Sequence, residues 1–343
     1  MKLSIKNPMK TIYILLLFSF IIILSSCSDN PVVQVDYTDL TEWTYIDSTA
    51  SGLVEQLALA EENILYIIRN NSGYKIENGV TTQINFNDND FYPTRVFAYN
   101  SSYIIFQGRS RSTLYQEIKI IKDNIITSPA GMPQGYECTD VIIIGKDKFV
   151  FGMDSVCYHY QNGAFSQTAL RSPYHNEISV GKFFIVDTVL CALAYSNNNS
   201  ENYIFSIRDN YGYFLENEPP GQRFFLGNNL AKLYEGAGTT NLNLYTLSGL
   251  RSIFSGPSRD YYKIIGENGS YLYMVASEHT GNFNIKNILW NGEKFIEQSY
   301  QPFLSSTYSY IAYFSNMKDN VFYCAWSIGS RYYLYKAKRI LRN

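Results

Sequence analysis

A tight polar turn followed by an almost continuous apolar run recurs along most of this chain, and this repeat limits the fold more than any other feature. The runs are rich in β-branched and aromatic residues, as is typical of strands covered on both faces. Their spacing averages about 43 residues, which is the length of a four-stranded unit. The seven runs are Ile64–Ile68, Tyr103–Phe106, Phe149–Phe151, Val189–Tyr195, Leu230–Tyr234, Tyr271–Ala276 and Val321–Trp326.

A second set of turns keeps the same period. These turns are Asn78-Gly79, Asp123-Asn124, Asn162-Gly163, Asp209-Asn210, Ser248-Gly249 and Asn291-Gly292. Asn-Gly favours a type I′ hairpin turn, because both central residues need positive φ angles. Together the two sets predict an all-β fold, a β-propeller of seven four-stranded blades, with six or eight blades as alternatives. Only Gly52–Glu62 has a pattern that would also suit a short helix.

The ends of the chain suggest how the ring closes. The seventh unit has its apolar strand and a third strand, Tyr332–Lys336, but no further hairpin before Asn343. Glu42–Ile46 is an extra strand before the first unit. We expect this segment to form the outer strand of the last blade, which removes exposed edges. Residues 42–343 are then one propeller domain. Its resemblance to β-propellers is architectural, because the chain carries neither a kelch double glycine nor a WD40 Gly-His/Trp-Asp pair.

The first 26 residues have the features of an export signal. Lys2, Lys6 and Lys10 precede an apolar stretch that is shorter than the roughly 20 residues of a membrane-spanning helix. Leu24-Ser25-Ser26-Cys27 follows and resembles the lipobox of bacterial lipoproteins, and Ser28-Asp29-Asn30 weakly resembles the export signal of Bacteroidota surface lipoproteins. The resemblance implies that residues 1–26 are removed, that Cys27 is lipidated, and that residues 27–41 tether the domain to the outer membrane.

The charge balance and the positions of the cysteines limit the partners and the disulfides that this chain can have. The chain has 28 basic and 30 acidic residues without a basic block, which argues against nucleic acid. We expect a monomeric domain. Cys191 and Cys324 lie in apolar runs and are expected to be buried. Cys138 and Cys157 are one candidate disulfide pair, and no spacing is of the metal-binding type.

Candidate binding residues lie on one face of the predicted ring. This face gathers the loops between second and third strands and the proline-rich connections between units. Aromatic rings and guanidinium groups there suit a sugar or an acidic glycan, although loops are polar in any fold. The candidates are Arg69, Tyr92, Arg109, Arg111, Asp154, Tyr174, Glu278, His279 and Arg331.

The sequence contains no catalytic or cofactor motif. A nucleophile elbow, a metalloprotease helix, a P-loop and a dinucleotide fingerprint are all missing. Asp154 with Glu278 is the carboxylate pair that would suit glycoside chemistry. Asn87-Asp88-Asn89-Asp90 offers oxygen ligands for calcium, but local Asx turns explain it more simply, so we predict neither a metal nor a cofactor.

These observations favour a non-catalytic, membrane-anchored binding module for a glycan or a partner protein. One alternative is a scaffold, similar to the propeller lipoprotein of the outer-membrane barrel assembly machinery. The other is a polysaccharide hydrolase or lyase.

Overall fold

The computed structural model describes residues 39–341, apart from 50–53, 136–137, 172–177, 197–200, 209–210, 237, 268, 270, 278–284, 298–311 and 329–330. The leader, Cys27 and most of the expected tether lie outside the described residues. The chain divides into two compact units, Leu40–Ile340 and the unit formed by Met1–Asp39 with Leu341–Asn343. Among the described residues, no helix is long and apolar enough to cross a membrane.

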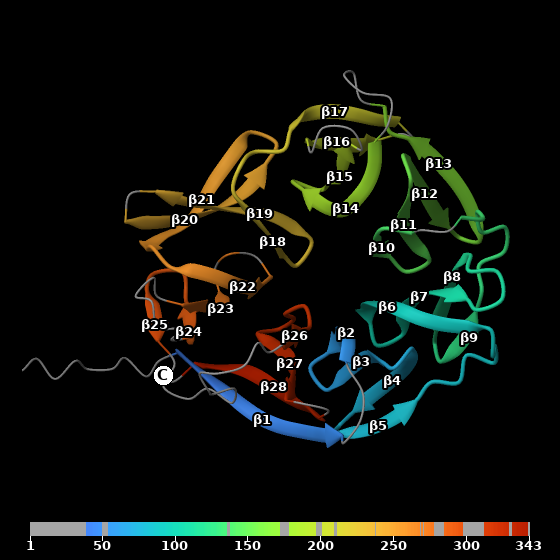
Figure 1. Ribbon diagram of the computed structural model, residues 1–343, viewed down its shortest axis with the longest axis horizontal. Coiled ribbons are helices and arrows are strands. Elements are labelled where there is room, and N and C mark those ends of the chain that lie inside the picture. The colour runs from blue at the N-terminus through green and yellow to red at the C-terminus, as the bar shows by residue number, and fades with distance from the viewer. Residues whose placement is uncertain are drawn as a thin grey trace, which may run out of the picture. The chain divides into compact units, whose positions relative to one another are not determined.

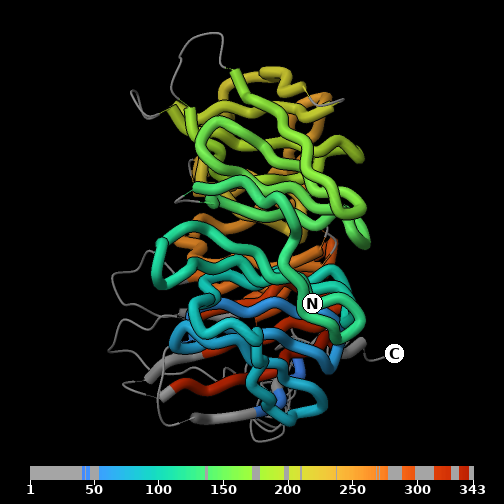
Figure 2. Tube along the Cα trace, turned by 90° about the vertical axis from the view of Figure 1, so that its right-hand side faces the viewer, coloured from blue at the N-terminus to red at the C-terminus, as the bar shows by residue number. Residues whose placement is uncertain are grey.

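Leu40–Ile340 forms a β-propeller of seven blades, each a sheet of four antiparallel strands (Figure 1). Figure 2 shows the same unit from the side, as a trace along the chain. Within each blade we give the strands from the innermost outward. Blades 1 to 3 are β2(Val54–Glu61), β3(Ile64–Arg69), β4(Ser72–Glu77), β5(Val80–Gln83); β6(Phe91–Asn100), β7(Tyr103–Ser110), β8(Gln116–Lys122), β9(Ile125–Thr127); and β10(Val141–Gly145), β11(Lys148–Met153), β12(Val156–Gln161), β13(Ala164–Ala169).

Blades 4 to 6 follow the same order along the chain. They are β14(Ile178–Val186), β15(Val189–Ser196), β16(Asn202–Arg208), β17(Tyr211–Asn217); β18(Gln222–Leu226), β19(Asn229–Gly236), β20(Thr239–Thr246), β21(Gly249–Pro257); and β22(Asp260–Gly266), β23(Leu272–Ser277), β24(Ile285–Trp290), β25(Phe295–Glu297). The predicted blade number is confirmed.

Blade 7 joins the two ends of the domain. Its order is β26(Ala312–Phe314), β27(Val321–Ile328), β28(Arg331–Leu341) and then β1(Asp39–Thr49) as the outermost strand. Figure 1 shows β1 beside β28, next to blade 1. The expectation that Glu42–Ile46 closes the last blade is therefore confirmed.

The apolar second strands are buried on both faces, as their composition predicts. Leu65 and Ile67 of β3 pack with Tyr323 and Leu334 of blade 7. The alternate residues of the same strand, Tyr66 and Ile68, pack with β6 and β7 of blade 2. Each blade therefore supplies apolar side chains to two inter-blade layers, and the core is a series of such layers around the ring.

Three of the six predicted hairpin turns, Asn78-Gly79, Asp123-Asn124 and Asn162-Gly163, have positive φ at both central residues. At Ser248-Gly249 and Asn291-Gly292 only the glycine has a positive φ, and Asp209-Asn210 lies outside the described residues. At Asn78-Gly79 the φ angles are 50° and 81°, and at Asn162-Gly163 they are 50° and 90°. Positive φ at both central residues is the signature of a type I′ turn.

The helical alternative for Gly52–Glu62 is wrong, because Val54–Glu61 forms β2. Leu and Ala favour a helix as isolated residues. Here Leu57, Ala58, Leu59 and Ala60 are all buried as successive residues of an innermost strand. Packing on both sides of the blade outweighs the intrinsic preference of the chain.

Polar side chains link neighbouring blades near the centre of the ring. Gln56 of blade 1 accepts a hydrogen bond from Val96 N of blade 2 at 2.8 Å. Gln222 of blade 5 donates to Tyr261 O of blade 6 at 3.1 Å. Asn316, next to β26 in blade 7, accepts from Leu59 N at 2.9 Å in blade 1 and donates to Leu59 O at 3.2 Å.

Two further bridges carry charge. Arg95 of blade 2 donates to Thr139 O, just before blade 3. Asp140, which is 2% exposed, accepts from Lys182 Nζ at 2.7 Å and from Phe183 N at 2.9 Å in blade 4. Innermost strands of different blades do not share a sheet. These side chains therefore satisfy backbone groups that a sheet would otherwise pair. We refer to all five contacts as the inter-blade bridges.

We predict that Asp140→Asn lowers the free energy of unfolding by about 2–3 kcal/mol, because it removes buried charge-assisted hydrogen bonds. Urea unfolding followed by tryptophan fluorescence measures the change. Asp123→Asn is the matched control, since Asp123 is an exposed turn residue whose ion pair is with exposed Lys146. The control should lose less than about 0.5 kcal/mol. Equal losses in the two variants would contradict a role for the bridge.

Candidate functional site

One face of the ring carries the loops between second and third strands together with the connections between blades. We call it the connection face. Its described parts include the loops 70–71, 111–115 and 154–155 and the connections 84–90, 128–135 and 218–221. Pro129, Pro133, Pro219 and Pro220 lie in these connections, whereas Pro93 and Pro257 belong to strand ends on the same face. Proline suits these places because it cannot donate to a sheet.

The structure describes some of the predicted binding residues and not others. Tyr174, Glu278 and His279 lie outside the described residues, and the side chain of Arg331 is not described. Asp154 is exposed in the turn between β11 and β12, with a φ angle of 50°. Whether Asp154 and Glu278 form a pair therefore stays a prediction.

Arg69 makes contacts between the first and the last blade of the ring. Its Nη1 atom donates to Tyr332 OH at 2.9 Å in blade 7, and its guanidinium lies 4.3 Å from the centre of the Tyr74 ring in blade 1. This cation–π and hydrogen-bonded arrangement joins the first and last blades.

Blade 2 brings three other candidates to the same end of the sheet. Tyr92 and Arg109 stand opposite each other in the β6–β7 pair. Arg111 follows β7, is exposed, and lines a cavity. Blade 2 therefore carries one of the predicted aromatic rings and two of the predicted guanidinium groups.

Two adjoining cavities open on this part of the connection face. The first, which we call the blade-2 cavity, has a volume of about 500 Å³ and lies between β8, the loop 111–115 and the connection 128–134. The second, the blade-1 cavity, has about 640 Å³ and is lined by the amide side chains Asn71, Gln83, Asn85 and Asn89, by aromatic rings and by Arg111. Asp88 borders both cavities. Volumes of this size are typical of ligand sites.

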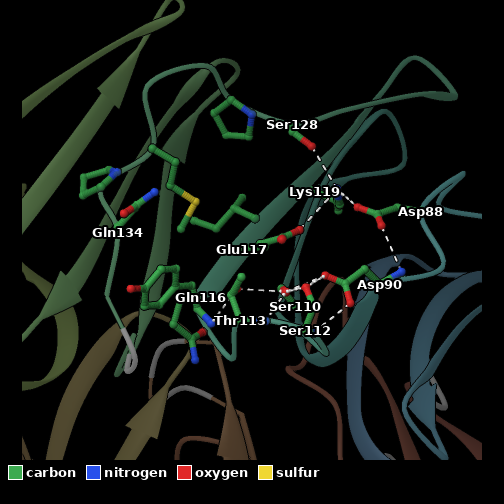
Figure 3. Close-up of a pocket in the computed structure, with 15 residues that line it drawn as sticks. Asp88, Asp90, Ser110, Ser112, Thr113, Gln116, Glu117, Lys119, Ser128 and Gln134 are labelled. Atoms are coloured by element: carbon green, nitrogen blue, oxygen red, sulfur yellow. Dashed lines mark hydrogen bonds and ion pairs between the residues drawn. The ribbon is translucent and has the colours of Figure 1, made fainter.

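The wall of the blade-2 cavity contains a buried lysine whose ammonium group has three polar neighbours. Lys119 Nζ lies 2.5 Å from Asp88 Oδ2, 3.4 Å from Glu117 Oε2 and 3.1 Å from Ser128 Oγ. Figure 3 shows Lys119 between Glu117 and Asp88. The hydrogen bond from Lys119 holds the pKa of Asp88 below its ordinary value, so this carboxylate stays charged.

Asp90 orders the neighbouring loop. Its carboxylate accepts from Ser110 Oγ at 2.5 Å, from Ser112 Oγ at 2.7 Å and from Ser112 N at 2.8 Å. Figure 3 shows these groups below the Lys119 cluster. Hydrogen bonds from the two serine hydroxyls, followed by the backbone, lower the pKa of Asp90.

The run Asn87–Asp90 is therefore explained by local structure, as the simpler hypothesis proposes. Asn85 Oδ1 accepts from Asn87 N at 2.9 Å, and Asp88 Oδ1 accepts from Asp90 N at 3.1 Å, which are Asx turns. Within the described part of the chain, no group of three or more His, Cys, Asp or Glu side chains is placed to hold a metal ion.

A second charged cluster on the connection face braces the connection between blades 4 and 5. Glu218, whose side chain is 3% exposed, receives two hydrogen bonds from Arg223 at 2.8 and 2.6 Å. Lys232 Nζ lies 2.5 Å from the same carboxylate, and Arg223 also donates to Tyr195 OH at 2.8 Å. Sequence analysis missed this cluster, because its members come from three different strands and one connection.

Burial and charge act in opposite directions on Glu218. Burial alone would raise its pKa, but hydrogen bonds from Arg223 and Lys232, with their positive charges, lower it below the ordinary value of 4.5. Lys232 has a lowered pKa because burial disfavours its charged form.

The four described cysteines and the described histidine are part of the packed interior. Cys138, Cys157, Cys191 and Cys324 are all buried and free. A Cys138–Cys157 disulfide does not form, because the two side chains belong to different inter-blade layers. His159 Nε2 lies 3.0 Å from Thr168 Oγ1, and burial lowers its pKa.

No family model and no curated protein matches the sequence. Solved structures match the fold. YCF48 from Cyanidioschyzon merolae aligns with a TM-score of 0.56 at 10% identity over 86% of this chain and 98% of its own. A structure of YCF48 bound to D1 peptide aligns with 0.55 at 9% identity over 92% and 100%. The propeller domain of Cps50 (Swd1) from Myceliophteria thermophila aligns with 0.51 at 9% identity over 86% and 99%. At these identities the likeness concerns the fold.

We predict that Glu218→Gln destabilises the protein most at neutral pH. The folded-state pKa of Glu218 is lowered, so its contribution to stability is complete above the unfolded value of about 4.5 and is lost as the pH falls below it. Urea unfolding of the wild type and the variant at pH 7, 5 and 3 measures the difference. A difference of about 2–4 kcal/mol at pH 7 should shrink by pH 3. A difference that is the same at all three pH values would contradict the ion-pair explanation.

Proposed function

We propose that this chain is a non-catalytic binding module that holds a segment of a partner protein on its connection face. The observation that carries this proposal is the pair of adjoining cavities around Asp88, with a combined lining of carboxylates, amides, hydroxyls and Arg111. Such a lining offers many donors and acceptors across two neighbouring cavities, which suits a main chain with polar side chains.

The ionisation state of the carboxylates at this surface supports a role in binding rather than in catalysis. Asp88 and Asp90 are both held by donors from their own protein, and their lowered pKa values keep them charged. A general acid needs a proton near neutral pH, which usually requires a raised carboxylate pKa. These two groups suit recognition and loop ordering.

The fold comparisons support a partner of protein nature. A structure of similar fold is YCF48 with a bound D1 peptide. A glycan is the second ligand class that the aromatic and guanidinium groups of blade 2 would accept, and the experiment below separates the two.

We also propose that the module is exported and anchored to the outer membrane through a lipid on Cys27. The support is the order of basic segment, apolar stretch and Leu24-Ser25-Ser26-Cys27 in the sequence. Several acyl chains on one residue would give a firm anchor, whereas a single chain binds a membrane only weakly.

We predict that a soluble form, Ser28–Asn343, enriches specific peptides from a library of random 12-residue sequences. Enriched peptides should bind with a 1:1 stoichiometry in calorimetry. Their binding should weaken about tenfold or more in Arg111→Gln, because the guanidinium lines the blade-1 cavity. A glycan array and a polysaccharide turnover assay run beside it. Saturable glycan binding without peptide enrichment, or product formation, would overturn the proposal.

We predict that palmitate labels the full-length protein in a bacterial host and that Cys27→Ala abolishes the label. The label should also be lost when lipoprotein diacylglyceryl transfer is inhibited. A variant with one buried cysteine replaced, Cys191→Ala, is the control and should keep the label. Labelling of Cys27→Ala at the level of the wild type would contradict the anchor.

A further inference from the structure

The blade-1 cavity lies where blades 1 and 2 meet on the connection face. Its lining includes Asn71 and Gly73 from the β3–β4 hairpin, Asn85 and Asn89 from the connection 84–90, and Arg111 after β7. The cavity has a volume of about 640 Å³, which is in the range of ligand sites.

Aromatic rings form an apolar part of this lining. Phe86 and Phe91 both line the cavity, and their ring centres are 5.0 Å apart in an edge-to-face arrangement. Phe86 also packs edge-to-face on Phe106, at 5.1 Å. A Cβ atom at Gly73 would lie only 2.9 Å from Phe86 Cζ, so the ring has room here because residue 73 has no side chain. Apolar rings beside a charge strengthen its electrostatic interactions, because they replace part of the surrounding water.

The two charged residues that line this cavity, Asp88 and Arg111, differ in their partners. Asp88 Oδ2 lies 2.5 Å from Lys119 Nζ, and Asp88 Oδ1 accepts from Asp90 N at 3.1 Å. The guanidinium of Arg111, by contrast, makes no hydrogen bond or ion pair with any residue that the structure describes. The charge that this cavity leaves open to a ligand is therefore positive.

The backbone of Arg111 is held in place although its side chain is exposed. Arg111 N donates to Asp90 O at 2.8 Å. The hydroxyls of Ser110 and Ser112, on either side of Arg111, donate to the Asp90 carboxylate at 2.5 and 2.7 Å (Figure 3). A loop that is ordered before binding loses less conformational entropy when a ligand binds, which favours affinity.

The neighbouring blade-2 cavity has the opposite charge. Asp88, Asp90 and Glu117 line it together with a single cation, Lys119. An acidic group of a ligand would be repelled there and attracted to Arg111. A guanidinium also matches the geometry of a carboxylate, to which it can donate two parallel hydrogen bonds.

We propose that an aspartate or glutamate side chain of the partner segment binds Arg111 in the blade-1 cavity, where its carboxylate accepts hydrogen bonds from the guanidinium. The amide side chains of Asn71, Gln83, Asn85 and Asn89 offer donors and acceptors to the main chain around that residue. This inference rests on the proposed function, and it specifies the chemistry of the group that the partner must supply.

The enriched 12-residue peptides give the first test. They should share an aspartate or glutamate at one position of their alignment. Replacing it by asparagine or glutamine should weaken binding to the wild type about tenfold, because a charge-assisted contact becomes neutral. The same replacement should change binding to Arg111→Gln by less than about twofold, since the partner of the carboxylate is already missing. Equal losses with the two proteins would overturn the contact.

The source of the carboxylate has its own test. A peptide with an amidated C-terminus should bind as well as the free acid, because the proposed group is a side chain. Loss of binding on amidation would overturn the side-chain assignment in favour of a C-terminal carboxylate.

Matched variants test the guanidinium. Arg111→Lys keeps the positive charge without the forked geometry, so it should recover part of the affinity that Arg111→Gln loses. Arg251→Gln is the control and should bind like the wild type, since Arg251 is exposed in β21 of blade 5 and lines neither cavity. Raising NaCl from about 50 to about 500 mM should weaken the wild type about threefold and Arg111→Gln hardly at all, because salt screens an exposed ion pair. The same salt response in both proteins, or equal losses in Arg251→Gln and Arg111→Gln, would contradict the inference.

Two outcomes separate this inference from the proposed function. Enriched peptides that bind 1:1 but share no acidic residue would overturn the inference and leave the proposed function standing. If no peptide is enriched, and an oligomer of uronic acid binds the wild type but not Arg111→Gln, the carboxylate comes from a glycan and both proposals are overturned.

Discussion

The burial of seven apolar strands between neighbouring blades is the constraint on which the rest of this structure depends. Each second strand has apolar side chains on both faces, so it is covered only if a blade lies on each side of it. An open row of blades would leave the first and last of these strands half exposed. Closure of the ring removes that cost, and the chain achieves it by placing β1 beside β28 in blade 7.

The inter-blade bridges solve a second problem that closure creates. The innermost strands converge on the centre but belong to different sheets, so some backbone groups there lack sheet partners. Gln56, Arg95, Asp140, Gln222 and Asn316 each reach the next blade and supply the missing partner. The lengths of the outer strands differ from blade to blade. Blade 2 shows such variation, where a short β9 leaves a cavity beside β8.

Much of the fold was accessible from local patterns. Turns such as Asn78-Gly79 identify hairpins because few residues accept positive φ angles, and strands such as Val189–Tyr195 identify double-sided burial. The pattern over Gly52–Glu62 also suits a helix, but the segment forms a strand because its burial in an innermost strand outweighs its local preference for a helix. From the sequence, the candidate site could be predicted only as one face of the ring, without the contacts between its residues. Arg111 could be placed there by counting strands, but Lys119 lies in an apolar run, and its partner Asp88 is 31 residues away.

The sequence by itself determined the length of the repeating unit, the position of each hairpin and the strand that closes the ring, and it favoured seven blades, because these depend on turn chemistry and on the period of apolar residues. Only the tertiary structure decided which polar residues meet. It brought Asp88 to Lys119, Glu218 to Arg223 and Lys232, and Arg69 to Tyr332, pairs that come from different strands and connections. It also decided how far each outer strand extends, as in blade 2, where β9 pairs with only three residues of β8. Pairing at an edge depends on where two chain segments separate in space, and no repeat in the sequence records that.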